Sequence, residues 1–248
     1  MTGVQTCALP ILSMENKRHK GLYESIIKRP MDFLCALLGL IILSPILLVL
    51  AIVVRIKLGG PVIFKQKRPG LNEKVFTLYK FRSMTDAKDE NGNLLPDDVR
   101  LTSFGSNLRD TSLDELPELF NILKGDMSIV GPRPQLVRDM VFMSEDHRRR
   151  HLVRPGLTGL AQISGRNAIA WEAKLDCDLE YMDKITFLGD MKIIFKTVGK
   201  VFAKEGISEE GMVTAEDYGD YLLNSGKVTA DDYNKLQQEA KDILEGRL

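Results

Sequence analysis

An uncharged apolar run of 22 residues, from Phe33 to Val54, sets the first limit on the fold. As one straight helix it would be about 33 Å long, enough to cross a hydrocarbon core of about 30 Å. Ser44 and Pro45 lie near its middle. Because Pro45 cannot donate a hydrogen bond to the carbonyl of Ile41 and its ring clashes there, we expect a kink. The Ser44 hydroxyl can satisfy a carbonyl freed in this way, which makes a break tolerable in lipid.

Both ends of this run are basic. The flanking residues are Lys17, Arg18, Lys20, Lys28 and Arg29 before it, and Arg55, Lys57, Lys65, Lys67 and Arg68 after it. A helix that spans the membrane is expected to have one basic side and one side poor in basic residues. A re-entrant hairpin accounts for two basic flanks, and its halves, about 18 Å and 14 Å long, are too short to span alone. Prolines also occur in spanning helices, so the residues by themselves leave both topologies open.

The distribution of charge separates the two ends of the chain. Its 248 residues have a formal net charge of zero. Residues 1–85, however, carry 13 Lys or Arg and 4 Asp or Glu, a net of +9, whereas residues 205–248 carry 4 and 11, a net of −7. A basic N-terminal third beside an apolar segment indicates contact with anionic lipid or phosphate. The three cysteines lie far apart and do not predict a disulfide framework. No P-loop motif occurs, so a P-loop ATPase is unsupported.

Four segments divide the chain. Residues 1–13 lack the pattern of a signal peptide, and we expect them to be disordered or an artefact of gene assembly, with Met14 as the natural start. We assign residues 14–58 to a membrane-associated segment and residues 59–210 to a soluble domain, the candidate catalytic domain. Residues 211–248 form an acidic tail in which VTAEDY, starting at residue 213, recurs as VTADDY 15 residues later. Each threonine can cap a short helix, and a solvated helical appendage is favoured over a protein-interaction tail.

The catalytic domain reads as a mixture of short strands and helices. Residues 61–66 and 74–84 have the pattern of two strands joined by a turn, and residues 86–98 that of an exposed loop. We expect helices at 112–126 and 136–153, strands at 127–134 and 157–166, and an amphipathic helical stretch at 171–204 with a break near 188–190.

Asp114 and Glu115 lie in the densest cluster of polar residues. Ser112 and Glu115 have the spacing of a capping box, while Pro117 fits better if Asp114 is the cap. Either way both carboxylates lie in the first turn of a helix, where the helix dipole keeps them ionised and backbone N–H groups suit a phosphate. An ionised aspartate beside Mg²⁺ can attack phosphorus. The plainer interpretation is that these acids only cap the helix.

Six cationic residues bracket this pair. They are Lys80, Arg82, Arg109, Arg133, Arg154 and Arg166. Several stand beside proline or glycine, where the backbone is fixed, and a fixed guanidinium fork suits phosphate oxygens. Each could serve only as a surface ion pair, and the hypothesis is that they converge on one anion.

A longer series of motifs carries a family resemblance. Between Tyr23 and Thr214 the chain contains, in order, KRPMDF, Ser44-Pro45, GGPVIFKQKRPG, FTLYKFRSM, SLDELPELFNILKGDMSIVGPRP and RHLVRPGLTGLAQISGRN. On these motifs it resembles the monotopic phosphoglycosyl transferases, a family of bacterial sugar transferases, and especially their small single-domain members.

The resemblance implies a reaction and a site. The family transfers a sugar phosphate from a UDP-sugar to polyprenol (undecaprenyl) phosphate and releases UMP, at the cytoplasmic face of the bacterial inner membrane. Asp114 is then the nucleophile that forms a covalent phosphosugar intermediate. Asp114 and Glu115 hold Mg²⁺, and Lys80, Arg109 and Arg133 lie near phosphate.

The resemblance also implies a fold. We expect a mostly helical α+β fold with a re-entrant helix-break-helix at Ser44-Pro45, a small β-hairpin or sheet, and amphipathic membrane-surface helices around a soluble core. The expected partners are a UDP-sugar, polyprenol phosphate and the phospholipid membrane, with no nucleic acid. Homo-oligomerisation and the identity of the sugar stay open. The alternative function is a membrane-anchored, non-enzymatic scaffold that uses the acidic tail.

Overall fold

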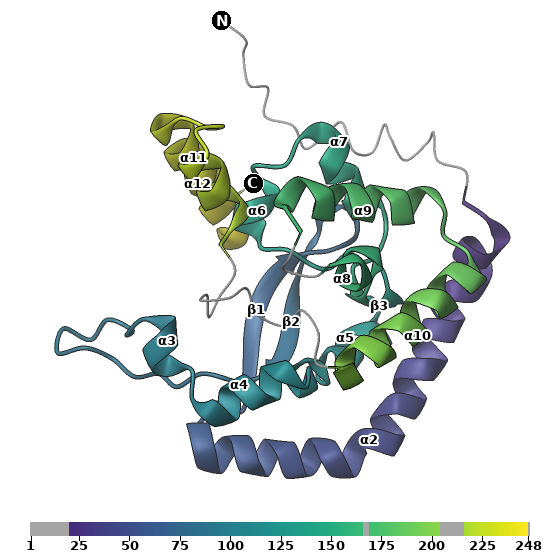
Figure 1. Ribbon diagram of the computed structural model, residues 1–248, viewed down its shortest axis with the longest axis horizontal. Coiled ribbons are helices and arrows are strands. Elements are labelled where there is room, and N and C mark those ends of the chain that lie inside the picture. Colours follow the sequence, from purple (N-terminus) through teal and green to yellow (C-terminus); the bar gives the residue numbers. More distant parts are fainter. Residues whose placement is uncertain (1–19, 166–168, 204–215, 248) are drawn as a thin grey trace, which may run out of the picture.

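The computed structural model describes residues 20–165, 169–203 and 216–247. Within them the chain forms an α+β fold that is mostly helical, with two sheets of two strands each and a long apolar helix near the N-terminus (Figure 1). This confirms the predicted fold class at that level. The segment 1–13, Arg166 and the start of the first VTAEDY motif lie outside the described residues.

The long helix bends without breaking. A single π-helical turn, η1 (Tyr23–Ile27), leads directly into α2 (Lys28–Leu58), which contains Pro45. The Ser44 hydroxyl donates a hydrogen bond to the carbonyl oxygen of Ile41 at 2.7 Å, as the sequence predicts. Figure 1 shows α2 as two arms that run in different directions. The predicted helix-break-helix is therefore one bent helix, because Ser44 satisfies the carbonyl that the proline leaves.

Most of α2 is not covered by the rest of the chain. The segment Tyr23–Leu58 is long and apolar enough to cross a membrane, and only 6% of its most apolar stretch is buried. The few buried positions tie each arm to the domain. Ala36 of the first arm packs with Leu119 and Ile122, whereas Val54 of the second arm packs with Leu108.

The first sheet is the predicted hairpin. Strands β1 (Ile63–Pro69) and β2 (Val75–Phe81) pair antiparallel with Ile63 opposite Phe81, and the turn between them contains η2 (Leu71–Glu73). The loop that follows β2 is exposed over most of its length, as expected. The chain then forms two helices, α3 (Asp97–Arg100) and α4 (Ser103–Asp110).

The helix expected at 112–126 is divided. A 3₁₀ turn, η3 (Leu113–Glu115), precedes α5 (Glu118–Lys124), and Pro117 is the N-cap of α5. Ser112 has a positive φ of 53° and forms no side-chain cap, so the predicted capping box is absent. The two acids therefore precede the α-helix. Gly125, with φ of 97°, ends α5 as predicted.

The second sheet is parallel and short. Strands β3 (Ser128–Val130) and β4 (Gly156–Thr158) pair with Ser128 opposite Gly156. The single helix predicted between them is wrong. The segment forms three short pieces, which are α6 (Val137–Met140), α7 (Glu145–Arg148) and η4 (Arg149–Leu152). Residues 140–143 are all buried in one cluster, and one regular helix cannot turn four consecutive side chains to the same side.

Helices follow β4, where the sequence predicted a longer strand. Only Gly156–Thr158 is extended, and the next residues form α8 (Leu160–Ser164). The last helices of the family region are α9 (Trp171–Asp183) and α10 (Phe187–Ala203). The break between them falls at residues 184–186, slightly before the predicted position.

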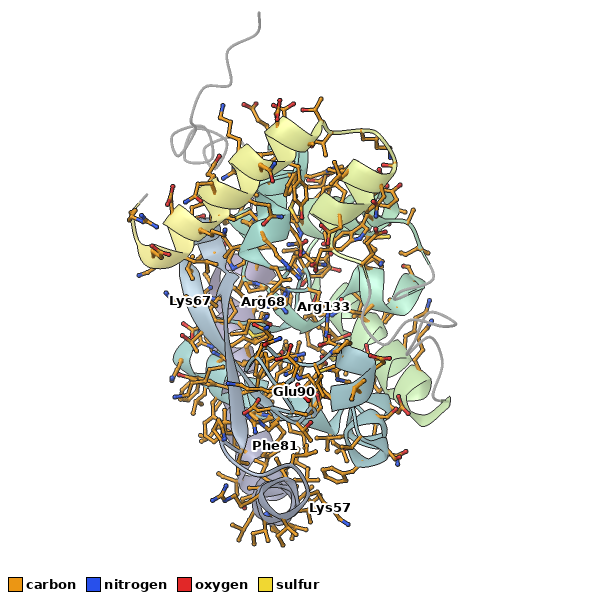
Figure 2. The ribbon with its side chains drawn as sticks, turned by 90° about the vertical axis from the view of Figure 1, so that its left-hand side faces the viewer. Lys57, Lys67, Arg68, Phe81, Glu90 and Arg133 are labelled. Atoms are coloured by element: carbon orange, nitrogen blue, oxygen red, sulfur yellow. The ribbon has the colours of Figure 1, made fainter. Side chains whose placement is uncertain are left out.

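The acidic tail is packed onto the catalytic domain. It forms α11 (Tyr218–Asn224) and α12 (Ala230–Glu245), which lie beside α6 in Figure 1. Tyr218 and Ala240 are buried in the cluster that α6 provides, so the favoured idea of a solvated appendage is wrong. Figure 2 shows Lys67, at the turn end of the hairpin, beneath the tail, and its Nζ atom donates to the carbonyl oxygen of Leu244.

The repeat in the tail works differently in its two copies. Thr229 caps α12 by accepting a hydrogen bond from the backbone N–H of Asp232 at 3.2 Å, as predicted. In the first copy α11 begins only at Tyr218, with Asp217 as N-cap and no side-chain cap bond.

Candidate active site

Asp114 projects from η3 without a direct partner. Its relative exposure is 8%, yet among the described residues its carboxylate makes no hydrogen bond or ion pair. The positive φ of Ser112 turns the chain just before η3, and the backbone N–H of Glu115 donates to the Ser112 carbonyl at 3.2 Å. The Asp114 oxygens are not among the fully buried unpaired atoms of the described residues, so solvent or a ligand can reach them.

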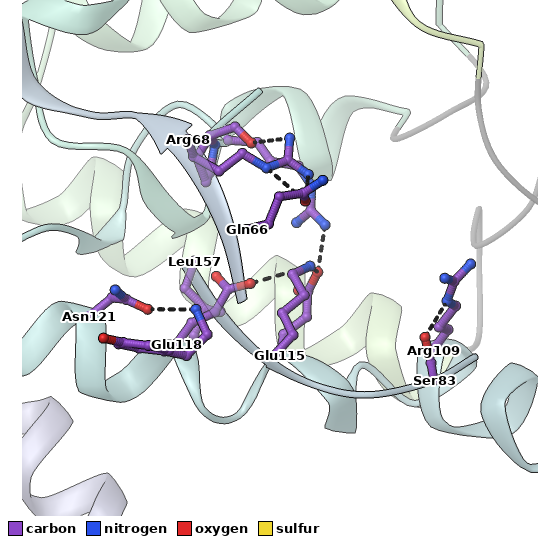
Figure 3. Close-up of polar contacts among 12 residues, drawn as sticks. Gln66, Arg68, Ser83, Arg109, Glu115, Glu118, Asn121 and Leu157 are labelled. Atoms are coloured by element: carbon purple, nitrogen blue, oxygen red, sulfur yellow. Dashed lines mark hydrogen bonds and ion pairs between the residues drawn. The ribbon is translucent and has the colours of Figure 1, made fainter. Parts of the chain in front are cut away.

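Glu115 is held by two cations from other parts of the chain. Its Oε1 atom lies 2.7 Å from Nζ of Lys80 on β2 and 2.5 Å from Nη2 of Arg133, in the turn after β3. Figure 3 shows the contacts that converge on Glu115. The structure thus brings Lys80 and Arg133 to the acidic pair Asp114-Glu115, and the role of these residues in binding an anion stays a prediction.

Glu118 is a third acid in the cluster that the sequence reasoning missed. It is 2% exposed, and its Oε1 atom lies 3.3 Å from Nζ of Lys80. One turn later, Asn121 accepts a hydrogen bond from the backbone N–H of Tyr79 at 3.1 Å and donates to the carbonyl of Thr77 at 2.7 Å. These bonds fix α5 against β2. The three-residue spacing of Glu115 and Glu118 was the only local signal.

The pKa values of the acids diverge. Burial, and then the charge of Glu115, raise the pKa of Asp114 to about 6. Burial acts in the same direction on Glu115, but the charges of Arg133 and Lys80 outweigh it and hold the pKa of this carboxyl well below its usual range. Burial raises the pKa of Glu118 to about 7. At neutral pH Glu115 is therefore ionised. The pKa values of Asp114 and Glu118 lie within about one unit of pH 7, so these two groups can gain or lose a proton near neutrality.

Three other predicted phosphate ligands make contacts of their own outside the Glu115 ion pairs. Arg109 donates from Nε to Oγ of Ser83 at 2.9 Å, and its charge is one of those that lower the pKa of Asp114. Arg82 donates to the carbonyl of Gly60 at 2.9 Å, beyond the end of α2. Arg154 donates to the carbonyl of Gly125 at 2.9 Å, just after the end of α5. Arg166 lies outside the described residues.

A buried ion pair supports the turn that carries Arg133. Arg150 donates from Nη2 to the carbonyl oxygen of Arg133 at 2.5 Å and to Oδ2 of Asp178 at 2.7 Å. Arg150 and Asp178 are each 2% exposed. No local pattern could have linked these residues, because Asp178 comes from α9.

The comparisons with known proteins agree with this arrangement. Residues 23–204 match the model of a family described as bacterial sugar transferase. The chain belongs to the bacterial sugar transferase family. This confirms the family resemblance, and the matched region contains the whole cluster around Asp114 but not the tail helices.

Relatives of this sugar transferase have named activities. It is 53% identical over 193 residues to the uncharacterized sugar transferase EpsL of Bacillus subtilis, covering 78% of this chain and 96% of that one. It is 40% identical over 204 residues to a UDP-glucose:undecaprenyl-phosphate glucose-1-phosphate transferase of Klebsiella pneumoniae, covering 78% of this chain and 44% of that one. An undecaprenyl-phosphate galactose phosphotransferase of Salmonella typhimurium is 38% identical over 197 residues, covering 73% of this chain and 41% of that one. The chain thus spans less than half of the length of these two enzymes.

The acids of this transferase fit Mg²⁺ only if a phosphate of the substrate supplies further ligands. Within the described residues, no group of three His, Cys, Asp or Glu side chains could hold a metal ion. Mg²⁺ usually binds through one or two carboxylates plus substrate phosphates and water. Asp114 offers a carboxylate without a hydrogen bond or ion pair to the described residues. Lys80 and Arg133 both contact Oε1 of Glu115 rather than its Oε2. The residues therefore fit a metal held jointly with a phosphate and do not form a protein cage.

Proposed function

We propose that this chain transfers a sugar phosphate from a UDP-sugar to polyprenol phosphate through a covalent intermediate on Asp114. The observation that carries the proposal is a contrast between the two acids. Asp114 has no hydrogen bond or ion pair to the described residues, whereas Glu115 is fixed by Lys80 and Arg133. An acid that is kept near a cluster of cations but bonded to none of them can reach a phosphorus atom. The named activities of the relatives support the same reaction.

The reaction proceeds in two displacements. An oxygen of Asp114 attacks the sugar-bearing phosphorus of the UDP-sugar, and the bond from this phosphorus to the bridging oxygen breaks, so UMP leaves. An oxygen of polyprenol phosphate then attacks the same phosphorus and displaces the Asp114 carboxylate, which gives polyprenyl diphospho-sugar. The positive charges of Lys80, Arg109 and Arg133 stabilise the negative charge of the phosphate groups. Mg²⁺, held by Asp114 and Glu115 together with phosphate, would neutralise further charge there.

We propose that α2 enters and leaves the cytoplasmic leaflet of the inner membrane. The apolar side chains that α2 exposes include Leu38, Ile42, Leu48, Ile52 and Ile56. Exposed Leu188 and Phe195 of α10 add to this apolar surface. The bend at Pro45 and the basic residues on both flanks support a re-entrant course. Single cysteines at Lys20 and Lys57, in a protein without its native cysteines, should both react with an impermeant reagent from the cytoplasmic side. Reaction from opposite sides would contradict the re-entrant course.

The decisive test of the function is the Asp114→Asn variant. It should release no UMP from any member of a panel of UDP-sugars supplied with undecaprenyl phosphate and Mg²⁺, while the wild type releases UMP with at least one. Full activity in the variant would refute the assigned nucleophile. The scaffold alternative makes the opposite prediction, since loss of residues 211–248 would then remove all function and Asp114→Asn would remove none.

A further inference from the structure

Arg68, near the end of β1, has a fixed position and no acidic contact. Its Nε and Nη2 atoms donate to Oε1 of Gln66 at 3.1 and 2.7 Å, and its Nη1 atom donates to the carbonyl of Pro134 at 3.2 Å. All these acceptors are neutral. Among the residues that the structure describes, no carboxylate oxygen lies within 4.0 Å of the guanidinium. Its charge is therefore oriented but is not neutralised by contact.

Arg133 lies beside Arg68. Figure 2 shows the two labelled side by side, and Pro134, which Arg68 contacts, directly follows Arg133 in the chain. Burial lowers the pKa of Arg68 to about 10, and the neighbouring charge of Arg133 contributes to this shift. Two guanidinium groups held together in this way repel each other. An anion with several oxygens relieves the repulsion and accepts hydrogen bonds from both.

The two arginines differ in what else they contact. Arg133 donates to Glu115, next to the proposed nucleophile, whereas Arg68 makes no such contact. Figure 3 shows Arg68 apart from Glu115, with Gln66 between the two. The phosphorus atom under attack has to lie near Asp114. Arg68 is therefore placed for the second phosphate of a diphosphate, the one that is not attacked.

We propose that Arg68 and Arg133 form a phosphate-binding pair and that Arg68 holds the phosphate that leaves with the nucleotide. The ligand class is a phosphate monoester or diphosphate, and its assignment to the nucleotide rests on the proposed function. Gln66 is the positioning residue of this pair, because its amide oxygen receives two of the Arg68 donors. The guanidinium loses little freedom on binding, since it is already oriented.

The test measures binding without turnover. UMP and inorganic pyrophosphate are titrated calorimetrically into the full-length protein in detergent, with EDTA and separately with Mg²⁺. Because hydrogen bonds between charged groups are strong, Arg68→Met should weaken both ligands by about tenfold or more. Arg68→Lys should weaken them less. Lys65→Met removes one charge from the exposed face of the same strand and serves as the matched control, with unchanged affinity.

Further arms separate the sources of the phosphate and guard against misfolding. Gln66→Met keeps the Arg68 charge but removes the amide oxygen that orients the guanidinium. The affinity for UMP should therefore fall, while the midpoint of thermal unfolding stays close to that of the wild type. If folded Arg68→Met and Gln66→Met both bind UMP and pyrophosphate as the wild type does, the proposal is overturned. A rise only in the KM for polyprenol phosphate would overturn the assignment to the nucleotide. Arg68-dependent pyrophosphate binding in a protein that releases no UMP would instead refute the proposed function and support the pair.

Discussion

Asp114 and Glu115 are adjacent in η3, yet the pKa values of their carboxyl groups are shifted in opposite directions. Lys80 and Arg133 contact Glu115 directly, whereas Asp114 has no ion pair with any residue that the structure describes. The charge of Glu115, kept in place by these cations, is also one cause of the raised pKa of Asp114. Glu115 therefore organises the cluster, while Asp114 stays available for reaction.

The same arrangement predicts that the nucleophile lowers stability. The pKa of Asp114 is raised to about 6 in the folded protein, above its ordinary value of 3.8, so folding favours the protonated form. The resulting cost grows as pH rises from about 4 and is complete above about 6. Asp114→Asn removes it and should raise the free energy of unfolding by about 1–2 kcal/mol at pH 8, while UMP release is lost. Denaturation in detergent at pH 8 and pH 5 checks this, because the gain should shrink at the lower pH.

The raised pKa also predicts how activity depends on pH. Only the ionised form of Asp114 can attack phosphorus. Without bound metal the pKa of Asp114 is about 6, so the rate of UMP release should fall at or below this pH. Bound Mg²⁺ would lower this midpoint. Pre-steady-state UMP release measured from pH 5 to pH 8 tests this, and a rate that rises toward pH 5 would contradict the assignment.

Lys80 is predicted to stabilise two buried acids at once. Removal of its charge leaves Glu118, which is 2% exposed, without its only cation within 4 Å among the described residues. Lys80→Met should therefore lower the free energy of unfolding by about 2–4 kcal/mol at pH 8. Adding Glu118→Gln should restore part of this loss, since it removes one unpaired charge. If the double variant is no more stable than Lys80→Met in urea unfolding, Glu118 does not carry the penalty.

Local patterns predicted the elements that are fixed by local chemistry. The hairpin, the end of α5 at Gly125 and the Thr229 cap each follow from a few neighbouring residues. The prediction of one helix at 136–153 was wrong because the consecutive residues 140–143 are all buried, which a single regular helix does not allow. Arg68 was read only as a basic flank of the apolar run, since a sequence shows neither burial nor which arginines lie side by side. Nor does a sequence show that Arg154 donates to the carbonyl of Gly125, and its assignment to phosphate stays a prediction.

The packing of the tail predicts that it stabilises the whole domain. The Tyr218 ring lies 5.2 Å from that of Trp171, and its backbone N–H donates to Asp139 at 2.9 Å. Tyr218→Ala should lower the free energy of unfolding by about 3 kcal/mol, because it removes a buried aromatic side chain. Lys235→Ala, on the exposed side of α12, is the control and should change it by less than about 0.5 kcal/mol. Equal effects of the two variants on the unfolding midpoint would show that the tail is not docked in solution.

The bend of α2 predicts that the stabilising effect of the Ser44 hydrogen bond depends on Pro45. The Ser44 hydroxyl bonds the Ile41 carbonyl, which has no backbone donor because residue 45 is a proline. Ser44→Ala should therefore destabilise the protein by about 1 kcal/mol in a lipid environment. Pro45→Ala restores the backbone donor, so Ser44→Ala should cost much less in that variant. Both arms of α2 are tied to the domain, through Ala36 and Val54, and the bend should persist without the proline. Thermal unfolding of the four proteins in nanodiscs measures the coupling, and additive effects would show that the serine bond does not replace the missing donor.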